Sequence, residues 1–217
     1  MSLSDVYSMV RKSDRYKATY AKYDADRRLI ASIDQKDLYR AYKYNSAGKK
    51  IYEHQYATPR KSHDFHILPA ASDSDRRLAW FYDHCNRERF SIDGEGTVTE
   101  KRYDERGLLV LEKTYARPYF DYDHCPDAAQ IIDAADRSTH YIYDSLGRMI
   151  FEIDGEGYVT VYDYEITSAK PSAISTYQER IRVPEVVNAE TIKTLINPIE
   201  HSKVLIKSIQ YDGLGRR

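Results

Sequence analysis

The 217-residue chain lacks any long apolar run and carries almost no excess charge of either sign. No segment is apolar over the length that a transmembrane helix or the core of a signal peptide requires. The formal net charge of −1 gives no electrostatic reason to bind nucleic acid or an anionic membrane surface. We therefore expect neither a nucleic-acid partner nor a membrane span.

Phenylalanine and tryptophan are scarce, whereas tyrosine is abundant. The chain has 5 Phe and 1 Trp against 21 Tyr, and its apolar share is 41%. That share is low for a compact core. Tyrosine suits a half-buried sheet because its ring is apolar while its hydroxyl can stay in water. The composition favours an extended, thin sheet over a globule.

The segment Thr139–Tyr164 contains a repeat unit. It has the form T-x-Y-x-Y-D-x-x-G-R, then an apolar stretch, then D-x-x-G-x-x-T-x-Y-x-Y, so its start matches its end. Tyr143 and Tyr164 hold equivalent places 21 residues apart. Such self-similarity is typical of architectures in which each repeat packs on its neighbours.

The unit predicts two tight turns and two strands. In D-x-x-G, the Asp side chain can accept backbone hydrogen bonds, and Gly can adopt a positive φ without strain. This chemistry favours a type I turn closed by a glycine bulge. The residues between and after the turns alternate in character, with Met149, Phe151 and Ile153 on one strand face and Tyr158, Thr160, Tyr162 and Tyr164 on another. One unit is therefore a length of antiparallel meander with ladders of Tyr and Thr.

The spacing of equivalent tyrosines predicts the domain organisation. From Tyr23 to Tyr211 the intervals are 21, 38, 21, 40, 21 and 47 residues, which implies a plain unit followed by an expanded one. We predict tandem modules at 23–81, 82–142 and 143–210, each of about four strands, with excursions on one side of the sheet. An N-terminal flank, 1–22, precedes them, and 211–217 begins a further truncated repeat, so we expect a segment of a longer protein.

Some places depart from the pattern. Arg27 and Asp37 replace turn glycines in the first unit, so we expect weaker turns there, whereas Asn86 in the second module is the next best residue for a left-handed position. The third excursion, 168–202, is the least regular. Within it we predict a short helix at 189–196 with Asn188 as its N-cap and a proline after its end, and a strand over 180–187.

The recurring pattern resembles the YD repeats of the RHS family. Tyr-Asp occurs seven times where chance predicts about two. The segment from Tyr143 to Tyr164 matches the repeat most fully, 93–104 matches it well, and Tyr211 opens another copy. The similarity extends over roughly Tyr23 to Tyr164 and the last seven residues. Members of the family include bacterial Rhs polymorphic toxins, the B and C components of insecticidal toxin complexes, and teneurins.

The resemblance implies an all-β fold, an elongated and curved antiparallel meander that forms an open arc of a β-shell. It implies secretion or a cell-surface location, and the rest of a parent RHS/YD-repeat protein and an encapsulated toxin domain as partners. Several family shells end in a self-cleaving aspartyl protease motif that contains Asp-Pro. No Asp-Pro occurs in this chain, so neither that protease nor a toxin domain is carried over. We expect no enzyme activity, catalytic residue, cofactor or metal.

Two Asp-His-Cys triplets are candidates for metal or redox chemistry. Asp83-His84-Cys85 falls at a predicted hairpin turn, and Asp123-His124-Cys125 lies in the second excursion. Two His and two Cys can ligate zinc, although each pair is adjacent and lacks the C-x2-C spacing. A Cys85–Cys125 disulfide and exposed turn residues are the other interpretations. The extracellular habit of the family keeps the disulfide in consideration.

The remaining motifs have simpler explanations. His63 and His66 have the H-x-x-H spacing, but Asp64 is the only nearby third ligand, which favours a loop. The D-G-E-G segments at 93–96 and 154–157 lack the alternate oxygen ligands of a calcium loop, so turn chemistry explains them. The tyrosine ladders could stack on sugars, although sheet packing is the simpler account.

Two hypotheses for function follow. The first is a non-enzymatic structural segment of an RHS/YD-repeat shell that encapsulates or displays a toxin or surface domain. The alternative is a glycan- or receptor-binding cell-surface adhesion module that uses its Tyr faces or its excursion loops, with glycans as the partner. Retention of fold with loss of specific binding in Tyr162→Ala would favour the alternative, whereas unfolding would favour the wall.

An isolated stretch of such a sheet should expose an unpaired edge at each end. Unpaired strand edges promote pairing between chains. We predict edge-to-edge self-association of this chain, seen by light scattering as a mass that rises with concentration. A mass that stays at one chain's 25.3 kDa at high concentration would contradict the prediction.

Overall fold

The computed structural model describes residues 7–9, 19–59, 64–184, 187–199 and 203–209. It confirms the predicted all-β class: antiparallel strands form an open sheet whose order follows the chain, and β1 and β14 are the outermost of the described strands. Two short helices accompany it within these ranges. No helix in the described ranges is both long and apolar enough to cross a bilayer. The predicted start of a further repeat at 211–217 lies outside the described residues.

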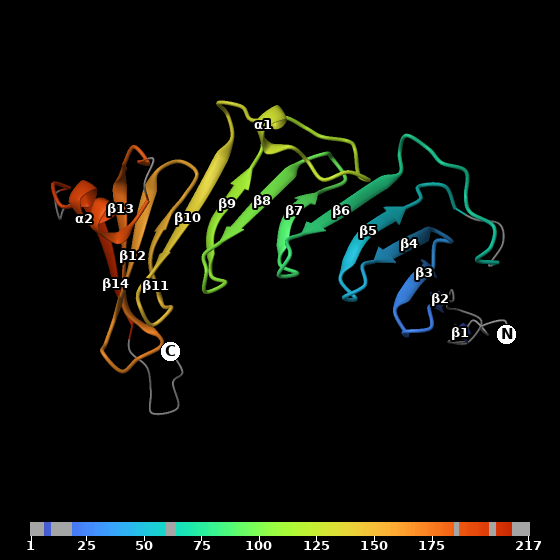
Figure 1. Ribbon diagram of the computed structural model, residues 1–217, viewed down its shortest axis with the longest axis horizontal. Coiled ribbons are helices and arrows are strands. Elements are labelled where there is room, and N and C mark those ends of the chain that lie inside the picture. The colour runs from blue at the N-terminus through green and yellow to red at the C-terminus, as the bar shows by residue number, and fades with distance from the viewer. Residues whose placement is uncertain (1–6, 10–18, 60–63, 185–186, 200–202, 210–217) are drawn as a thin grey trace. The chain divides into compact units, whose positions relative to one another are not determined.

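The chain divides into two compact units. Unit 1 consists of residues 1–98 and 117–132, and unit 2 of residues 99–116 and 133–217. Figure 1 labels the elements of both. The elements of unit 1 are β1 (Tyr7–Met9), β2 (Tyr20–Tyr23), β3 (Leu29–Ile33), β4 (Tyr39–Tyr44), β5 (Lys50–Gln55), β6 (Arg76–Tyr82), β7 (Glu88–Ile92) and α1 (Ala128–Ile131).

Unit 2 repeats the same sequence of hairpins. Its elements are β8 (Val98–Tyr103), whose first residue belongs to unit 1, β9 (Leu109–Thr114), β10 (Arg137–Tyr143), β11 (Met149–Ile153), β12 (Tyr158–Tyr164), β13 (Pro171–Arg180), α2 (Ala189–Ile196) and β14 (Val204–Ser208). Asn188 caps α2, as predicted, by accepting a hydrogen bond from the Thr191 N–H at 2.9 Å.

The third excursion is more regular at its start than predicted, and less regular afterwards. β13 occupies 171–180 and pairs with both β12 and β14, so the segment 168–202 includes a long strand. The strand predicted over 180–187 is wrong, because residues 181–184 have no regular structure. There the chain leaves the sheet and approaches the turn before β12: the Ile181 N–H donates to the Gly157 carbonyl at 2.9 Å.

The D-x-x-G turns have the predicted geometry. At Asp144, the Gly147 N–H donates to the Asp144 carbonyl at 3.1 Å and the Asp144 N–H donates to the Arg148 carbonyl at 2.9 Å. The strand register shifts at Tyr143, the place of the predicted bulge. Gly147 has a φ of 79°, and Arg27, Asp37 and Asn86 have a φ of 62° in the same position of their turns. The departures from glycine therefore keep the turn conformation.

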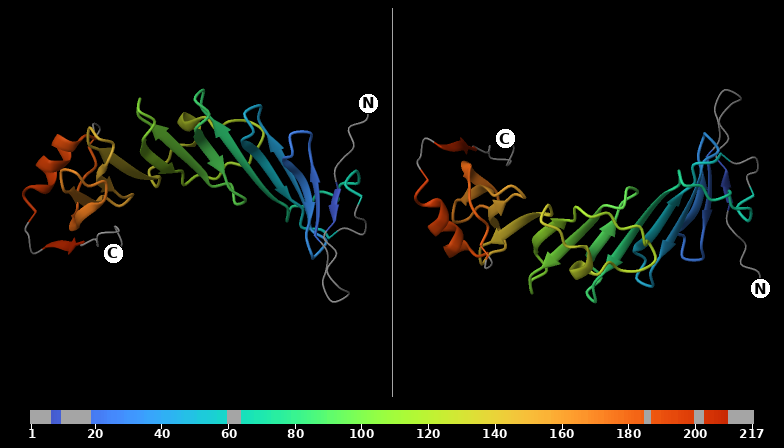
Figure 2. Two further views of the ribbon diagram at one scale, coloured as in Figure 1. Left: turned by 90° about the horizontal axis from the view of Figure 1, so that it is seen from below. Right: turned by 90° about the horizontal axis from the view of Figure 1, so that it is seen from above.

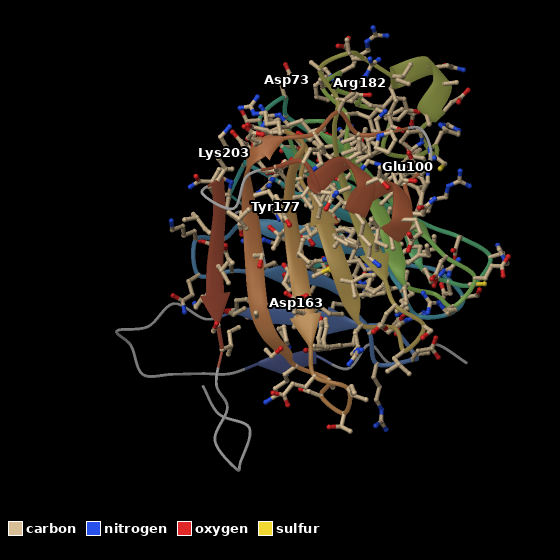
Figure 3. The ribbon with its side chains drawn as sticks, turned by 90° about the vertical axis from the view of Figure 1, so that its left-hand side faces the viewer. Asp73, Glu100, Asp163, Tyr177, Arg182 and Lys203 are labelled. Atoms are coloured by element: carbon tan, nitrogen blue, oxygen red, sulfur yellow. The ribbon has the colours of Figure 1, made fainter. Side chains whose placement is uncertain are left out.

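One face of each unit is buried beneath an excursion. The isoleucines that precede the second turn, Ile33 and Ile153, are fully buried. In unit 1, Phe65 of the first excursion packs with Ile33. In unit 2, Ile192 of α2 packs with Ile153, and Tyr177 of β13 packs against the same cluster. Figure 2 shows α2 beside the strands, and Figure 3 labels Tyr177. Burying an isoleucine contributes about 2 kcal/mol, so packing holds this short helix.

Two turn glycines allow the cost of a positive φ to be separated from the cost of a close backbone contact. Gly48 has a φ of 76° and open space where a Cβ would lie, whereas a Cβ on Gly157 would come within 2.4 Å of the Ile181 carbonyl oxygen. We predict that Gly48→Ala lowers the free energy of unfolding by about 1 kcal/mol, through left-handed strain alone. Gly157→Ala should lower it by about 3 kcal/mol, because the third excursion must also move. Equal losses in chemical denaturation would contradict this assignment.

Candidate functional site

The tyrosine of the repeat uses its hydroxyl inside the sheet. Tyr82, Tyr143 and Tyr164 each end a strand, and their hydroxyls donate to the carbonyls of Lys50, Leu109 and Met149 at 2.8–2.9 Å. Tyr44 makes the same bond to Leu29 at 2.8 Å. Each acceptor lies at the start of the preceding strand. These phenols tie each hairpin to its neighbour, so their hydroxyls are not available to a ligand.

The aspartate carboxylate of the repeat also forms hydrogen bonds within the structure. Asp144 Oδ1 accepts the N–H groups of Leu146 and Arg148, and its Oδ2 binds Arg148 Nε at 2.7 Å. Burial alone would raise the pKa of Asp144, but the hydrogen bonds from the Arg148 N–H and guanidinium outweigh it, so the pKa is lowered. Asp83 makes the same bonds with Cys85 and Arg87. The Tyr-Asp dipeptide therefore supplies structure at these turns.

One buried carboxylate closes the base of the first expanded loop, and an equivalent one closes the second. The Asp75 side chain, 1% exposed, accepts the N–H of Ala57 at 2.9 Å and that of Ser72 at 3.1 Å, and contacts His54 Nε2 at 3.0 Å. It joins the strand before the first excursion to the strand after it. Burial opposes ionisation, but the two N–H donors and the imidazole outweigh it and lower the pKa of Asp75.

The second excursion has the same closure at the equivalent residue. Asp136 accepts the N–H of Ala116 at 2.9 Å and that of Asp133 at 3.1 Å, and binds Lys113 Nζ at 2.9 Å. Lysine here takes the place that His54 has in the first module. Burial would raise the pKa of Asp136, but these donors lower it. The repeated Asp-Arg before Tyr82 and Tyr143 was visible in the sequence, but its bonding partners lie about 20 residues away.

Glu100 is the fully buried carboxylate among the described residues. Its oxygens bind Arg102 Nε at 2.8 Å, Arg102 Nη2 at 3.2 Å and the Tyr115 hydroxyl at 2.7 Å. Burial and this hydrogen bond raise the pKa of Tyr115. The equivalent residues of the other modules are Ala41 and Val161. Because Glu100 is paired with Arg102 and Tyr115 and has no counterpart in the other modules, we assign it a role in local packing and not in a functional site.

The structure does not bring the two Asp-His-Cys triplets into a metal site. Within the described ranges, no three His, Cys, Asp or Glu side chains gather to hold a metal ion. Cys85 and Cys125 are exposed and are not joined as a disulfide. His84 lies at an exposed turn, and His124 contacts Asp121 Oδ2 at 2.8 Å instead. The sequence left three interpretations open: a zinc site, a disulfide and exposed residues. Both cysteines have the exposed position of the third.

The other sequence motifs are also turns or loops. Asp93 and Asp154 use Oδ1 to accept the N–H groups two and four residues further on, at 2.9 Å in each case. His66 is exposed, and its N–H donates to Asp64 Oδ1 at 2.9 Å. His63 lies outside the described residues. Tyr162 donates its hydroxyl to Glu152 Oε2 at 2.8 Å, so this ladder tyrosine has a partner within the sheet.

The excursions form clefts with the strands, which the sequence did not predict. In unit 1, a cleft of about 480 Å³ lies between β4–β6 and residues 122–125 of the second excursion. Tyr52, Phe81 and Tyr122 line it, together with Lys43 and Asp123. These three aromatic side chains are half-buried, whereas Lys43 and Asp123 are exposed. The cleft is a concave site with aromatic lining, the kind of surface at which small molecules bind.

Unit 2 has a cleft at the equivalent place. It measures about 450 Å³ and lies between β8–β10 and residues 187–189 of the third excursion. Arg102, Leu111 and Ile142 line it where Lys43, Tyr52 and Phe81 line the first. His140 also lines it, with a buried Nδ1 that has no hydrogen-bond partner in the described structure. A loop from further along the chain covers each of these two clefts, and the residues that line them differ.

Comparison with known proteins identifies a similar fold. No protein-family model and no curated protein matches the chain. Among solved structures, TcdB2-TccC3-Cdc42 has a TM-score of 0.60 at 10% identity over 94% of this chain, and TcdB2-TccC3 without its hypervariable C-terminal region has 0.59 at 11% over 93%. The Photorhabdus luminescens Tc holotoxin pore has 0.60 at 11% over 94%.

This likeness concerns a small part of large proteins. The chain spans 9% of each of those three chains. At 10–11% identity the similarity establishes the fold and not a shared activity. The chain therefore has the fold of a stretch of β-sheet found in Tc toxin complex chains.

The Asp75 closure can be tested with a neighbouring control. Asp75→Ala leaves two backbone N–H groups without their acceptor, so we predict a loss of about 2 kcal/mol in the free energy of unfolding. Asp73 is exposed on the same loop and is labelled in Figure 3. Asp73→Ala should change the stability by less than about 0.5 kcal/mol. Equal effects of the two substitutions would exclude a structural closure at Asp75.

The lowered pKa values predict a dependence on acid pH. Asp75, Asp136 and Asp144 have a lower pKa in the folded state, so their contribution is complete above the unfolded pKa of about 3.9 and is lost as pH falls below it. Burial lowers the pKa of His140, which adds a loss that begins below about pH 6.5. Denaturant titrations from pH 8 to 2 should show both steps, and Asp136→Asn should reduce only the lower one. Stability that is constant across this range would contradict the assignment.

Proposed function

We propose that this chain is a non-enzymatic length of wall from an RHS/YD-repeat shell, which encapsulates or displays a toxin or a surface domain. The observation that carries the proposal is the internal use of the repeat's own polar groups. The Tyr143 hydroxyl bonds the neighbouring strand, and the Asp144 carboxylate holds its own turn. A residue pair with these two structural roles would recur as units are added to a wall.

The fold likeness supports the same proposal. It extends over 94% of this chain, and the matched structures are TcdB2-TccC3 complexes and a Tc holotoxin pore. An open meander can be lengthened at either outer strand by adding hairpins, since each hairpin contacts only its neighbours. The modules at 23–81, 82–142 and 143–210 would be successive increments of such a wall. The rest of a parent protein and an enclosed toxin domain would be its partners, in a secreted or cell-surface setting.

The adhesion hypothesis is better supported by the excursions than by the repeat tyrosines. The hydroxyls of Tyr143, Tyr162 and Tyr164 are bound within the sheet, so a glycan platform made by these tyrosines would have only their ring faces to offer. Binding through the excursions does not have this difficulty, because they differ in sequence between modules. Any recognition function would therefore belong to the clefts that the excursions cover.

Cryo-electron microscopy of the longest natural polypeptide that contains this chain would test the wall. We expect additional strands paired outside both β1 and β14, and a sheet that encloses a separate polypeptide segment. A particle in which either strand remains an outer edge, with no enclosed polypeptide, would overturn encapsulation. Display alone would appear as a continued sheet with an external domain.

A further inference from the structure

We propose that the cleft of unit 1 is a binding site for a neutral saccharide. Its volume of about 480 Å³ lies in the usual range for small-molecule sites. The site goes beyond the wall role, and either can be wrong without the other. Three features of the cleft carry the inference: its aromatic lining, two charged groups that have no ion pair among the described residues, and its fixed cover.

The lining offers aromatic surface from three separate elements. Tyr52 comes from β5, Phe81 from β6 and Tyr122 from the second excursion, and each is half-buried. Half-exposed aromatic rings on a concave surface can pack against the apolar C–H face of a sugar ring. In the cleft of unit 2 the strand residues at the first two positions are Leu111 and Ile142. Tyr141 and Tyr143 line that cleft too, so the difference lies at these two positions, where the repeat does not require an aromatic residue.

The charged groups of the cleft balance one another. No hydrogen bond or ion pair of the Lys43 ammonium group is found in the described part of the chain, where it lies 4.8 Å from the centroid of the Tyr52 ring. The Asp123 carboxylate likewise has no hydrogen bond or ion pair within the described residues, although the Asp123 N–H donates to Asp121 Oδ1. Asp83 also lines the cleft, but its oxygens are occupied by Cys85 and Arg87. One donor cation and one acceptor anion suit a neutral ligand rich in hydroxyl groups.

The cover of the cleft is fixed in place. The Tyr122 hydroxyl donates to the Asp93 carbonyl at 3.1 Å, and the Tyr119 N–H donates to the Gly96 carbonyl at 2.8 Å. A Cβ on Gly96 would lie 2.7 Å from the Phe120 ring, so glycine allows this close approach. A site whose walls are already ordered loses less entropy when a ligand binds.

A peptide is a poorer occupant than a sugar. Peptides that bind β-proteins commonly add a strand at a free sheet edge. The strands beneath this cleft have no free edge, because β5 pairs with β4 on one side and with β6 on the other. An extended peptide would find side chains here but no backbone partners.

The second module supplies matched substitutions for the test. Tyr52→Leu and Phe81→Ile introduce the residues that unit 2 has at the same positions, so the fold should be retained. The full chain would be applied to an array of neutral di- and trisaccharides, and the tightest would be titrated by calorimetry. We expect measurable binding that each substitution weakens by roughly tenfold. Lys43→Met and Asp123→Asn should weaken it too, and Lys49→Met at the adjacent exposed turn should not.

Three outcomes would overturn the proposal. The first is an array on which no saccharide is retained. The second is binding that Tyr52→Leu and Phe81→Ile leave unchanged while their unfolding transitions match that of the original chain. The third is selective retention on a parallel array of random peptides, which would make the cleft a peptide groove. Loss of binding together with normal unfolding transitions in both variants supports the saccharide site.

Discussion

The structure depends on one local interaction, an aspartate that caps its own turn. The carboxylate of Asp144 holds two backbone N–H groups and the Arg148 guanidinium, and the same bonds recur at Asp83 with Arg87. Once the turn is formed, the preceding tyrosine is placed to reach the carbonyl of the strand before it. Hydrogen bonds within each turn thus support the register of its hairpin, together with the buried face that includes Ile33 and Ile153.

The expanded loops add the variable part of each module to this constant base. Asp75 and Asp136 close their loops with equivalent pairs of N–H donors and with different basic side chains, His54 and Lys113. The loops that lie over the two clefts differ, and so do the linings: Tyr52 and Phe81 beneath residues 122–125 are replaced by Leu111 and Ile142 beneath residues 187–189. The turns and strands therefore share one hydrogen-bonding pattern, whereas the loops over the clefts differ in sequence.

Features set by neighbouring residues could be predicted from the sequence, and features set by distant ones could not. The turn glycines, the strand faces and the Asn188 cap depend on a few adjacent positions. The strand proposed over 180–187 failed because the chain there turns toward Gly157, a contact that alternation of apolar residues does not encode. The clefts were missed for the same reason: Tyr122 meets the wall formed by Tyr52 only after the second excursion has folded back.

The most direct test of the account is a substitution series at Asp144, followed by chemical denaturation. Asn45 occupies the equivalent place in the first module and accepts the same two N–H groups. Asp144→Asn should therefore cost less than about 1 kcal/mol, from loss of the Arg148 ion pair, whereas Asp144→Ala should cost about 2 kcal/mol because the N–H groups lose their acceptor. An Asp144→Ala variant whose free energy of unfolding equals that of the original chain would contradict the central claim that the repeated aspartate holds the sheet together.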